Sequence, residues 1–145
     1  MSSHMQQVQQ EVSSWDGVTE SPHRFGGVEF KLANAEVGHI HQNGLVDIPF
    51  PMKIRNQLVL EGLVSKHHVL TNSGWISFRV RSENDVPHAI WLLKLSYLRY
   101  VLKRNNQAKM ETNGNKELRA LNLSDELITV FEKAIGASKR NNPFK

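Results

Sequence analysis

Two histidines stand two positions apart in the segment EVGHIH, and an aspartate follows after a short turn. The histidines are His39 and His41, and Asp47 comes just past the turn signal Asn43-Gly44. Residues two apart on a β-strand point to the same side, about 6.6 Å apart along the chain. We therefore expect the two imidazoles to face one place, with a carboxylate beside them.

Imidazoles in such a position suit acid–base chemistry. With an ordinary pKa near 6.5, an imidazole can take a proton from an acidic enol or phenol at neutral pH. A neighbouring carboxylate would raise that pKa and orient the ring. The same spacing also fits a polar strand face that is simply exposed to water, and the residues alone leave both interpretations open.

A second pair, His67 and His68, is adjacent in the chain, so on a strand the two side chains point to opposite faces. One of them can join the first pair, with His68 the better candidate; the alternative places one ring in the core and the other in solvent. His39, His41 and His68 with Asp47 could form a metal site. No compact signature such as His-Glu-x-x-His is present, so we predict no metal and no cofactor.

Trp75 and Arg79 share one face of the segment WISFRVR. A ring and a guanidinium on one wall could bind an aromatic or carboxylated ligand by stacking and anion recognition. The alternative is a tryptophan covered by an arginine stem. No phosphate-binding glycine loop and no Ser-His-Asp or Cys-His arrangement can be argued from the spacing.

The composition is that of an ordinary water-soluble domain. The chain has 145 residues, of which 39% are hydrophobic and 22% charged, and it contains no cysteine. No apolar run is long enough for a membrane span, and the polar N-terminus does not look like a signal peptide. We expect one domain, no membrane association and a cytoplasmic location. The first five residues, MSSHM, look like a cloning remnant and are left out of the functional argument.

The formal net charge is +4, with much of the excess late in the chain. Nucleic-acid binding would require this charge to gather on one face. Spread over the surface, it mainly favours solubility. Nucleic acid is therefore not the predicted partner, although a nucleic-acid-binding or protein-binding module that uses the basic end of the long helix remains the alternative.

The expected elements make an α+β fold. Its sheet has two hairpins and a short strand, with a long helix on one face and a further helix at the C-terminus. Strands are expected at 28–32, 36–41 and 45–48, and then as a second hairpin at 64–70 and 75–81. In the second of these strands Val37 is expected to share a face with His39 and His41. A helix is expected over 52–61, opened by Pro51 and closed by Gly62.

Two apolar stripes run along the long helix, which is expected from Ser82 to about Arg104. Packing on a sheet requires only one stripe, so the second must meet another surface. We predict that the C-terminal helix, 124–136, covers it, either in the same chain or across a homodimer. The predicted layout is a disordered or tag-derived N-terminus (1–14), an α+β domain (15–104), a linker (105–123), the C-terminal helix and a tail (137–145).

The segments GHIHQNGLVDIPFP, KHHVLTNSGWISFRV and SENDVPHAIWLLKLSYLRYVL resemble, in this order, the luciferase-domain family. This family comprises small bacterial proteins of unknown function that share a domain with fungal luciferases. The resemblance covers roughly Gly26 to Leu102, and its later histidine falls nearest His68. It implies an α+β domain and an oxygenase-like reaction without a cofactor, in which O₂ adds to an enol-rich pyrone.

Together, the residues and the resemblance predict a small planar ligand held in a histidine-lined pocket by His39, His41, Asp47 and His68. Whether a reaction follows is left open. A weaker likeness connects the tryptophan-containing hairpin and the Leu95-Ser96-Tyr97 helix with proteins of the YjbR type, which have a CyaY-like fold. A third interpretation is a homodimer built on the second apolar stripe.

Overall fold

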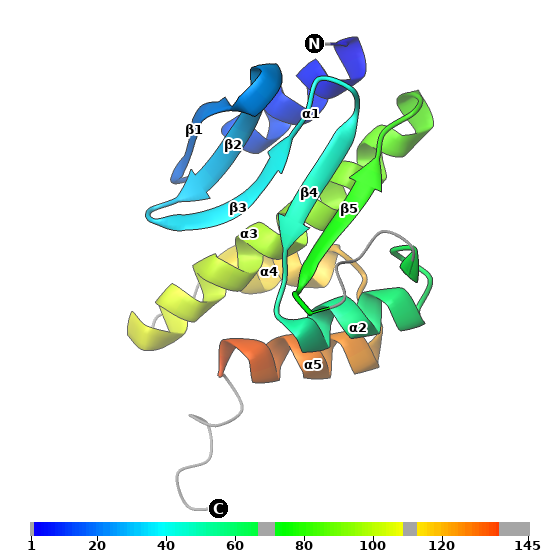
Figure 1. Ribbon diagram of the computed structural model, residues 1–145. Coiled ribbons are helices and arrows are strands. Elements are labelled where there is room, and N and C mark those ends of the chain that lie inside the picture. Colours follow the sequence, from blue (N-terminus) through cyan, green and yellow to red (C-terminus); the bar gives the residue numbers. More distant parts are fainter. Residues whose placement is uncertain (1, 67–71, 109–112, 137–145) are drawn as a thin grey trace, which may run out of the picture.

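The computed structural model describes residues 2–66, 72–108 and 113–136. They form one antiparallel sheet with its helices gathered on one side and at one end (Figure 1). The elements are α1 (Ser3–Ser13), β1 (Val18–His23), β2 (Gly27–Leu32), β3 (Ala35–Ile40), β4 (Leu45–Pro49), α2 (Met52–Leu60), β5 (Trp75–Arg79), α3 (Val86–Ala108), α4 (Asn113–Ala120) and α5 (Asp125–Ile135). The predicted α+β class, with a long helix on the sheet and a C-terminal helix, is confirmed.

The five strands follow one another in space as they do in sequence, in the order β1-β2-β3-β4-β5. Two details differ from the prediction. Strand β1 was not expected, because VTESPH is mostly polar and contains Pro22, which suits an edge strand but gives no alternating signal. Strand β5 pairs with β4, with Ile48 opposite Ile76, whereas its predicted partner at 64–70 lies mostly outside the described residues. Residues 64–66 are not in a strand, and His67 and His68 lie outside the described residues.

The core lies between the sheet and α3. From the sheet it includes Phe30, Ile40 and Ile48, and from α3 it includes Leu92 and Leu93, all fully buried. Gly38 allows the close approach of the helix, because a Cβ atom at this position would lie 2.8 Å from Leu93 Cδ2. Because α3 packs against one face, the opposite face of the sheet, toward the viewer in Figure 1, carries no helix of the described residues. That open face carries the histidines.

The N-terminal segment is a helix and not the disordered end that was predicted. Met5, Val8 and Val12 of α1 are fully buried, and the helix packs against α3. The hydroxyl of Tyr97 in α3 donates a hydrogen bond of 2.6 Å to the backbone carbonyl of Asp16, just after α1. The first residues therefore belong to the core of the domain.

The C-terminal helix begins and ends where the sequence predicted. Ser124 Oγ accepts a hydrogen bond from the Leu127 backbone N–H at 3.0 Å, and Gly136 ends the helix with φ 80°. Leu127 and Phe131 are fully buried, and α5 packs against α2 and α3 of its own chain. The second stripe of α3 is thus covered without a partner chain.

Helices occupy most of the described part of the predicted linker, 105–123. Helix α3 continues to Ala108, and α4 occupies Asn113–Ala120. Trp91 Nε1 donates to the carbonyl of Leu121 at 3.1 Å, which ties the end of this segment to α3. Among the described residues, no helix combines the length and the hydrophobicity that crossing a membrane requires. The predicted tail, 137–145, lies outside the described residues.

Candidate functional site

A row of polar side chains crosses the open face of the sheet. Antiparallel pairing places Ser21 opposite Glu29, Glu29 opposite His39, His39 opposite Asp47, and Asp47 opposite Ser77. Directly paired residues point to the same side of a sheet. The row therefore collects one polar side chain from each of the five strands, and it includes the predicted pair His39 and Asp47.

The carboxylate of Asp47 is the centre of this site. One oxygen, Oδ2, lies 2.8 Å from His41 Nε2 and 3.1 Å from His39 Nε2. The other, Oδ1, accepts a hydrogen bond from Ser77 Oγ at 2.5 Å. The structure thus brings together His39, His41 and Asp47, as the sequence predicted, and adds Ser77 as the group that fixes the carboxylate.

A β-bulge at Val37 brings a second carboxylate to His39. Phe30 pairs with Gly38, but the next residue of β2, Lys31, pairs with Glu36, so Val37 is an extra residue in β3. The expected sharing of a face by Val37 and the histidines is therefore wrong: Val37 is fully buried in the core. The extra residue puts Glu36 on the open face, where its Oε2 lies 2.6 Å from His39 Nδ1.

Both ring nitrogens of His39 consequently face carboxylate oxygens, an arrangement that favours the doubly protonated ring. Burial is the strongest influence on the pKa of His39 and lowers it. The hydrogen bonds to Asp47 and Glu36 and the charges of both groups outweigh burial, so the pKa is raised above 6.5. The pKa of Asp47 is also subject first to burial, which raises it. Hydrogen bonds from His39, Ser77 and His41 prevail and hold the pKa well below 3.8.

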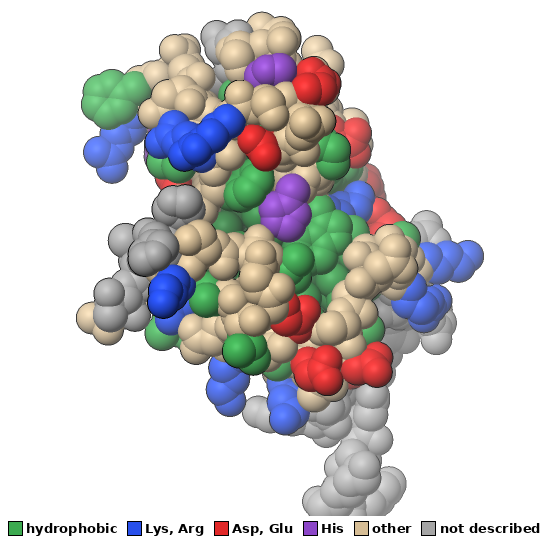
Figure 2. All heavy atoms as spheres, turned by 90° about the vertical axis from the view of Figure 1, so that its right-hand side faces the viewer, with side chains coloured by type: hydrophobic (Ala, Val, Ile, Leu, Met, Phe, Trp, Pro, Cys, Tyr) green, Lys and Arg blue, Asp and Glu red, His purple; other side chains and the backbone are tan. Residues whose placement is uncertain are grey.

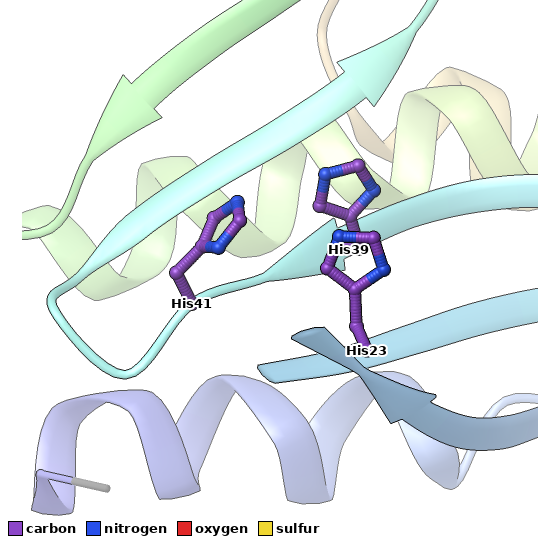
Figure 3. A group of neighbouring side chains, drawn as sticks. All are labelled: His23, His39 and His41. Atoms are coloured by element: carbon purple, nitrogen blue, oxygen red, sulfur yellow. The ribbon is translucent and has the colours of Figure 1, made fainter. Parts of the chain in front are cut away.

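A third histidine, His23 at the end of β1, joins this group. Its ring stacks on that of His39 with the centroids 4.0 Å apart, and its centroid lies 5.6 Å from that of His41 (Figure 3). His23 Nδ1 lies 3.5 Å from Glu29 Oε1. Sequence reasoning missed His23 because it missed β1. The glycine pair after it, which marks a turn before the next strand, was the available signal.

The other predicted site residues divide between this cluster and its surroundings. The ring of Trp75 lies near His39, with centroids 5.4 Å apart, and can form one wall of the site. Arg79 Nη1 instead donates to the carbonyl of Asn43 at 3.1 Å, and Arg79 borders a cavity of about 380 Å³ that Phe78 and His88 also line. His68 lies outside the described residues, so its predicted role stays a prediction.

The cluster is half-buried: the side chains of His39, Asp47 and His41 are 13%, 19% and 25% exposed.

A cavity of about 650 Å³, larger than the one beside Arg79, lies where α2, α3 and the segment before α5 meet. It is lined by residues that include Leu63, His88, Trp91, Leu121 and Leu123. On the face shown in Figure 2, hydrophobic side chains gather around a histidine. The ring of His88 stacks on Trp91, and its Nε2 lies 2.8 Å from the Leu63 carbonyl, so structural contacts account for this side chain.

The histidine cluster can take part in two kinds of chemistry. Paired with a carboxylate, an imidazole can accept a proton from a bound ligand and hold the resulting negative charge nearby. Within the described part of the chain, His23, His39 and His41 also form a group able to hold a metal ion, with one ring nitrogen from each lying within 4.8 Å of the others. Both possibilities use the same open face.

Comparison with known proteins connects part of the chain with a family. Residues 34–96 match the family described as the Luciferase domain. The matched segment includes His39, His41, Asp47, Trp75 and Arg79, and begins after β1 and β2, so that His23 lies outside it. No curated protein and no solved structure matches the chain significantly, and the likeness to YjbR-type proteins finds no support in these comparisons.

Proposed function

We propose, from the match of residues 34–96 to the Luciferase domain, that this protein binds a small planar molecule with an acidic O–H group on the histidine face of its sheet. An oxygenase-like reaction on that molecule is the proposed activity. The observation that carries the proposal is the carboxylate of Asp47, fixed by Ser77 and shared by His39 and His41.

The shape and polarity of the cluster support a planar ligand. The imidazoles of His39 and His41 stand nearly perpendicular to each other, with an angle of 85° between their planes. The indole of Trp75 beside His39 adds an aromatic surface on which a ring can stack. A flat molecule whose oxygen reaches the imidazoles would meet both kinds of group. The ligand would stay partly open to solvent, because no helix within the described ranges covers this face.

The proton transfer follows from the tautomer that Asp47 favours. An ionised carboxylate accepts hydrogen bonds only, so the proton of His41 is held on Nε2, toward Asp47, and the lone pair is left on Nδ1. The O–H bond of the ligand would break, its proton would form an N–H bond at Nδ1, and the negative charge would stay on the ligand. His39, between two carboxylates, would supply a positive charge to the resulting anion. Addition of O₂ to an enol requires this electron-rich anion.

Thermal unfolding of the protein in EDTA, with and without a hydroxylated pyrone, tests the proposal. A ligand present at ten times its Kd stabilises the folded chain by about 1.4 kcal/mol, which raises the Tm by about 3–6 °C. We expect this shift with the native chain and none with the double variant H39A/H41A. The variant H4A, which removes a histidine outside the cluster, should respond like the native chain. The O-methyl ether of the same pyrone should give no shift, because it lacks the acidic proton.

Three results would argue against the proposal. Retention of the shift in H39A/H41A would place the ligand elsewhere on the molecule. An equal shift with the methyl ether would show that the protein does not recognise the acidic O–H group. Loss of the folded state in H39A/H41A, seen by circular dichroism, would identify the pair as structural.

A further inference from the structure

We propose that His23, His39 and His41, together with Asp47, form a binding site for one divalent transition-metal ion of the zinc type. The site adds β1 to the elements that build the cluster and gives His23 a role. It does not depend on the ligand proposed above, because an ion can bind the four side chains whether or not a pyrone-like molecule is recognised.

The separations among three of the four groups suit a shared ion. Metal–nitrogen and metal–oxygen bonds of about 2.1 Å leave two ligand atoms about 3.4 Å apart at the tetrahedral angle that zinc prefers. Asp47 Oδ2 lies 3.1 Å from His39 Nε2 and 2.8 Å from His41 Nε2. Asp47 Oδ2 thus lies close to both imidazole nitrogens, so an ion could take the place of the protons between them with small movements of the side chains.

His23 can supply the fourth ligand atom. A ring nitrogen of His23 lies within 4.8 Å of those offered by His39 and His41, and the three rings occupy the same side of the sheet (Figure 3). The turn after β1 lies close to the segment after β3, since a Cβ atom at Gly26 would lie only 2.2 Å from Gln42 Nε2. The end of β1, and therefore His23, lies beside this segment, which follows His41.

Carboxylates around the cluster supply the outer contacts that metal-binding histidines require. A histidine ligand commonly donates its second N–H to a carboxylate, which orients the ring and increases its basicity. Glu36 Oε2 lies 2.6 Å from His39 Nδ1, the ring nitrogen that faces away from Asp47. Glu29 Oε1 lies 3.5 Å from His23 Nδ1. Ser77 Oγ donates a hydrogen bond to Asp47 Oδ1, the oxygen that does not contact the histidines. Each of these contacts positions a proposed ligand.

The donor set defines the class of ion. Three imidazoles and one carboxylate favour Zn²⁺, Co²⁺, Fe²⁺ or Ni²⁺ over Mg²⁺ and Ca²⁺, which prefer oxygen ligands. The positive charge of the ion would be balanced by Asp47, Glu36 and Glu29. With the ion in place, a deprotonated ligand oxygen could occupy an open coordination position, so the same acidic group suits both forms of the cluster.

Metal titration of the chain without a histidine tag tests the inference, with no pyrone present. We expect one Zn²⁺ per chain by calorimetry at neutral pH, and one Co²⁺ with visible absorption bands typical of nitrogen ligands. H23A should weaken Zn²⁺ binding at least tenfold, because it removes one ligand and leaves the other three. H4A serves as the matched control, since it removes a histidine beside a carboxylate, Glu83, outside the cluster, and it should bind Zn²⁺ like the native chain.

A second measurement on the unmodified chain covers the case in which H23A does not fold. Bound Zn²⁺ should protect His23, His39 and His41, but not His4, from modification by diethyl pyrocarbonate, as read by peptide mass spectrometry. Absence of binding by the native chain, equal affinity in H23A, loss of binding in H4A alone, or no protection of the three histidines would overturn the inference. The pyrone measurement is made in EDTA and this one without ligand, so each proposal can fail while the other stands.

Discussion

At the scale of single residues, Asp47 determines the arrangement of the site. Its two oxygens accept hydrogen bonds from two imidazoles and one hydroxyl, and its carboxylate is only 19% exposed. A half-buried charge with such partners is stabilised relative to its state in the unfolded chain. Part of the stability of the protein should therefore depend on the ionisation of this one group.

The sign of this dependence follows from the pKa of Asp47, which folding lowers. Its contribution is present above the unfolded value of about 3.9 and is lost as the pH falls through and below that value. In EDTA, D47N should be less stable than the native chain by about 1.5–3 kcal/mol at pH 7. The difference should shrink steadily in acid.

Urea denaturation from neutral pH to about pH 3 measures this difference, with unfolded-state titration expected near pH 3.9. The variant D16N, which changes an exposed aspartate, is the control and should keep a small and constant difference from the native chain. A D47N difference that stays constant in acid would contradict the assignment of the charge to these hydrogen bonds.

Sequence reasoning predicted His39, His41 and Asp47 because strand alternation and one turn signal were enough to place them together. It could not place Glu36, because the extra residue at Val37 shifts the alternation and nothing local marks a bulge. It could not place His23 without β1. The residues that surround the predicted pair therefore depended on pairing between strands, which local spacing does not encode.

At the scale of elements, the predicted boundaries were best where capping residues set them. Ser124 and Gly136 bound α5, and Pro51 precedes α2, as expected. Helix α1 was missed although Met5, Val8 and Val12 repeat at intervals of three and four residues. Met5, the first residue of that repeat, belongs to MSSHM, which looks like a cloning remnant although Met5 is fully buried.

Tyr97 links α1 to the rest of the fold and provides a test of this packing. Burial is the main reason that its pKa is raised, and the negative charges of Glu117 and Asp16 add to the effect. The neutral phenol is therefore favoured in the folded state. Its contribution to stability is present below the unfolded value of about 10 and is lost as the pH rises above it.

Y97F should be less stable than the native chain by about 0.5–1.5 kcal/mol near pH 8, because the hydrogen bond to the Asp16 carbonyl is lost. The difference should narrow above about pH 10. Urea denaturation at several alkaline pH values, followed by tryptophan fluorescence, measures it. A difference that does not change with pH would show that the hydroxyl is not sequestered by folding.

At the scale of the whole molecule, the second apolar stripe of α3 is covered by other elements of the same chain. Leu95, Leu98 and Leu102, which belong to the second stripe of α3, are buried, and so are Leu127 and Phe131 of α5. A homodimer is therefore not needed to cover this stripe. We expect the full chain to be a monomer by light scattering.

F131A should expose this surface. Removing a fully buried phenylalanine costs about 3–5 kcal/mol, and release of α5 should produce concentration-dependent association. L60A, which shortens a leucine that is 78% exposed, is the matched control and should change neither stability nor mass. A native chain that is already dimeric, and that F131A converts to a monomer, would favour the interface interpretation.

The distribution of charge bears on the alternative of a binding module. On the face shown in Figure 2, Lys and Arg side chains lie in separate places and do not form one patch. Electrostatic binding of nucleic acid requires several cations along one surface and weakens steeply with salt. The separation of the cations on this face therefore favours the interpretation that the +4 net charge is spread over the surface and supports solubility.

The bulge at Val37 also sets how this protein tolerates change. If β3 alternated regularly with Val37 retained, Val37 would face outward and Glu36 inward, where a carboxylate would be buried beneath the sheet without the imidazole it now contacts. Substitutions between the Ala33–Asn34 turn and His39 alter one side chain at a time, whereas loss of the bulge at constant length would exchange the faces of Val37 and Glu36. The contact between Glu36 and His39 thus depends on the bulge as much as on the types of the two residues.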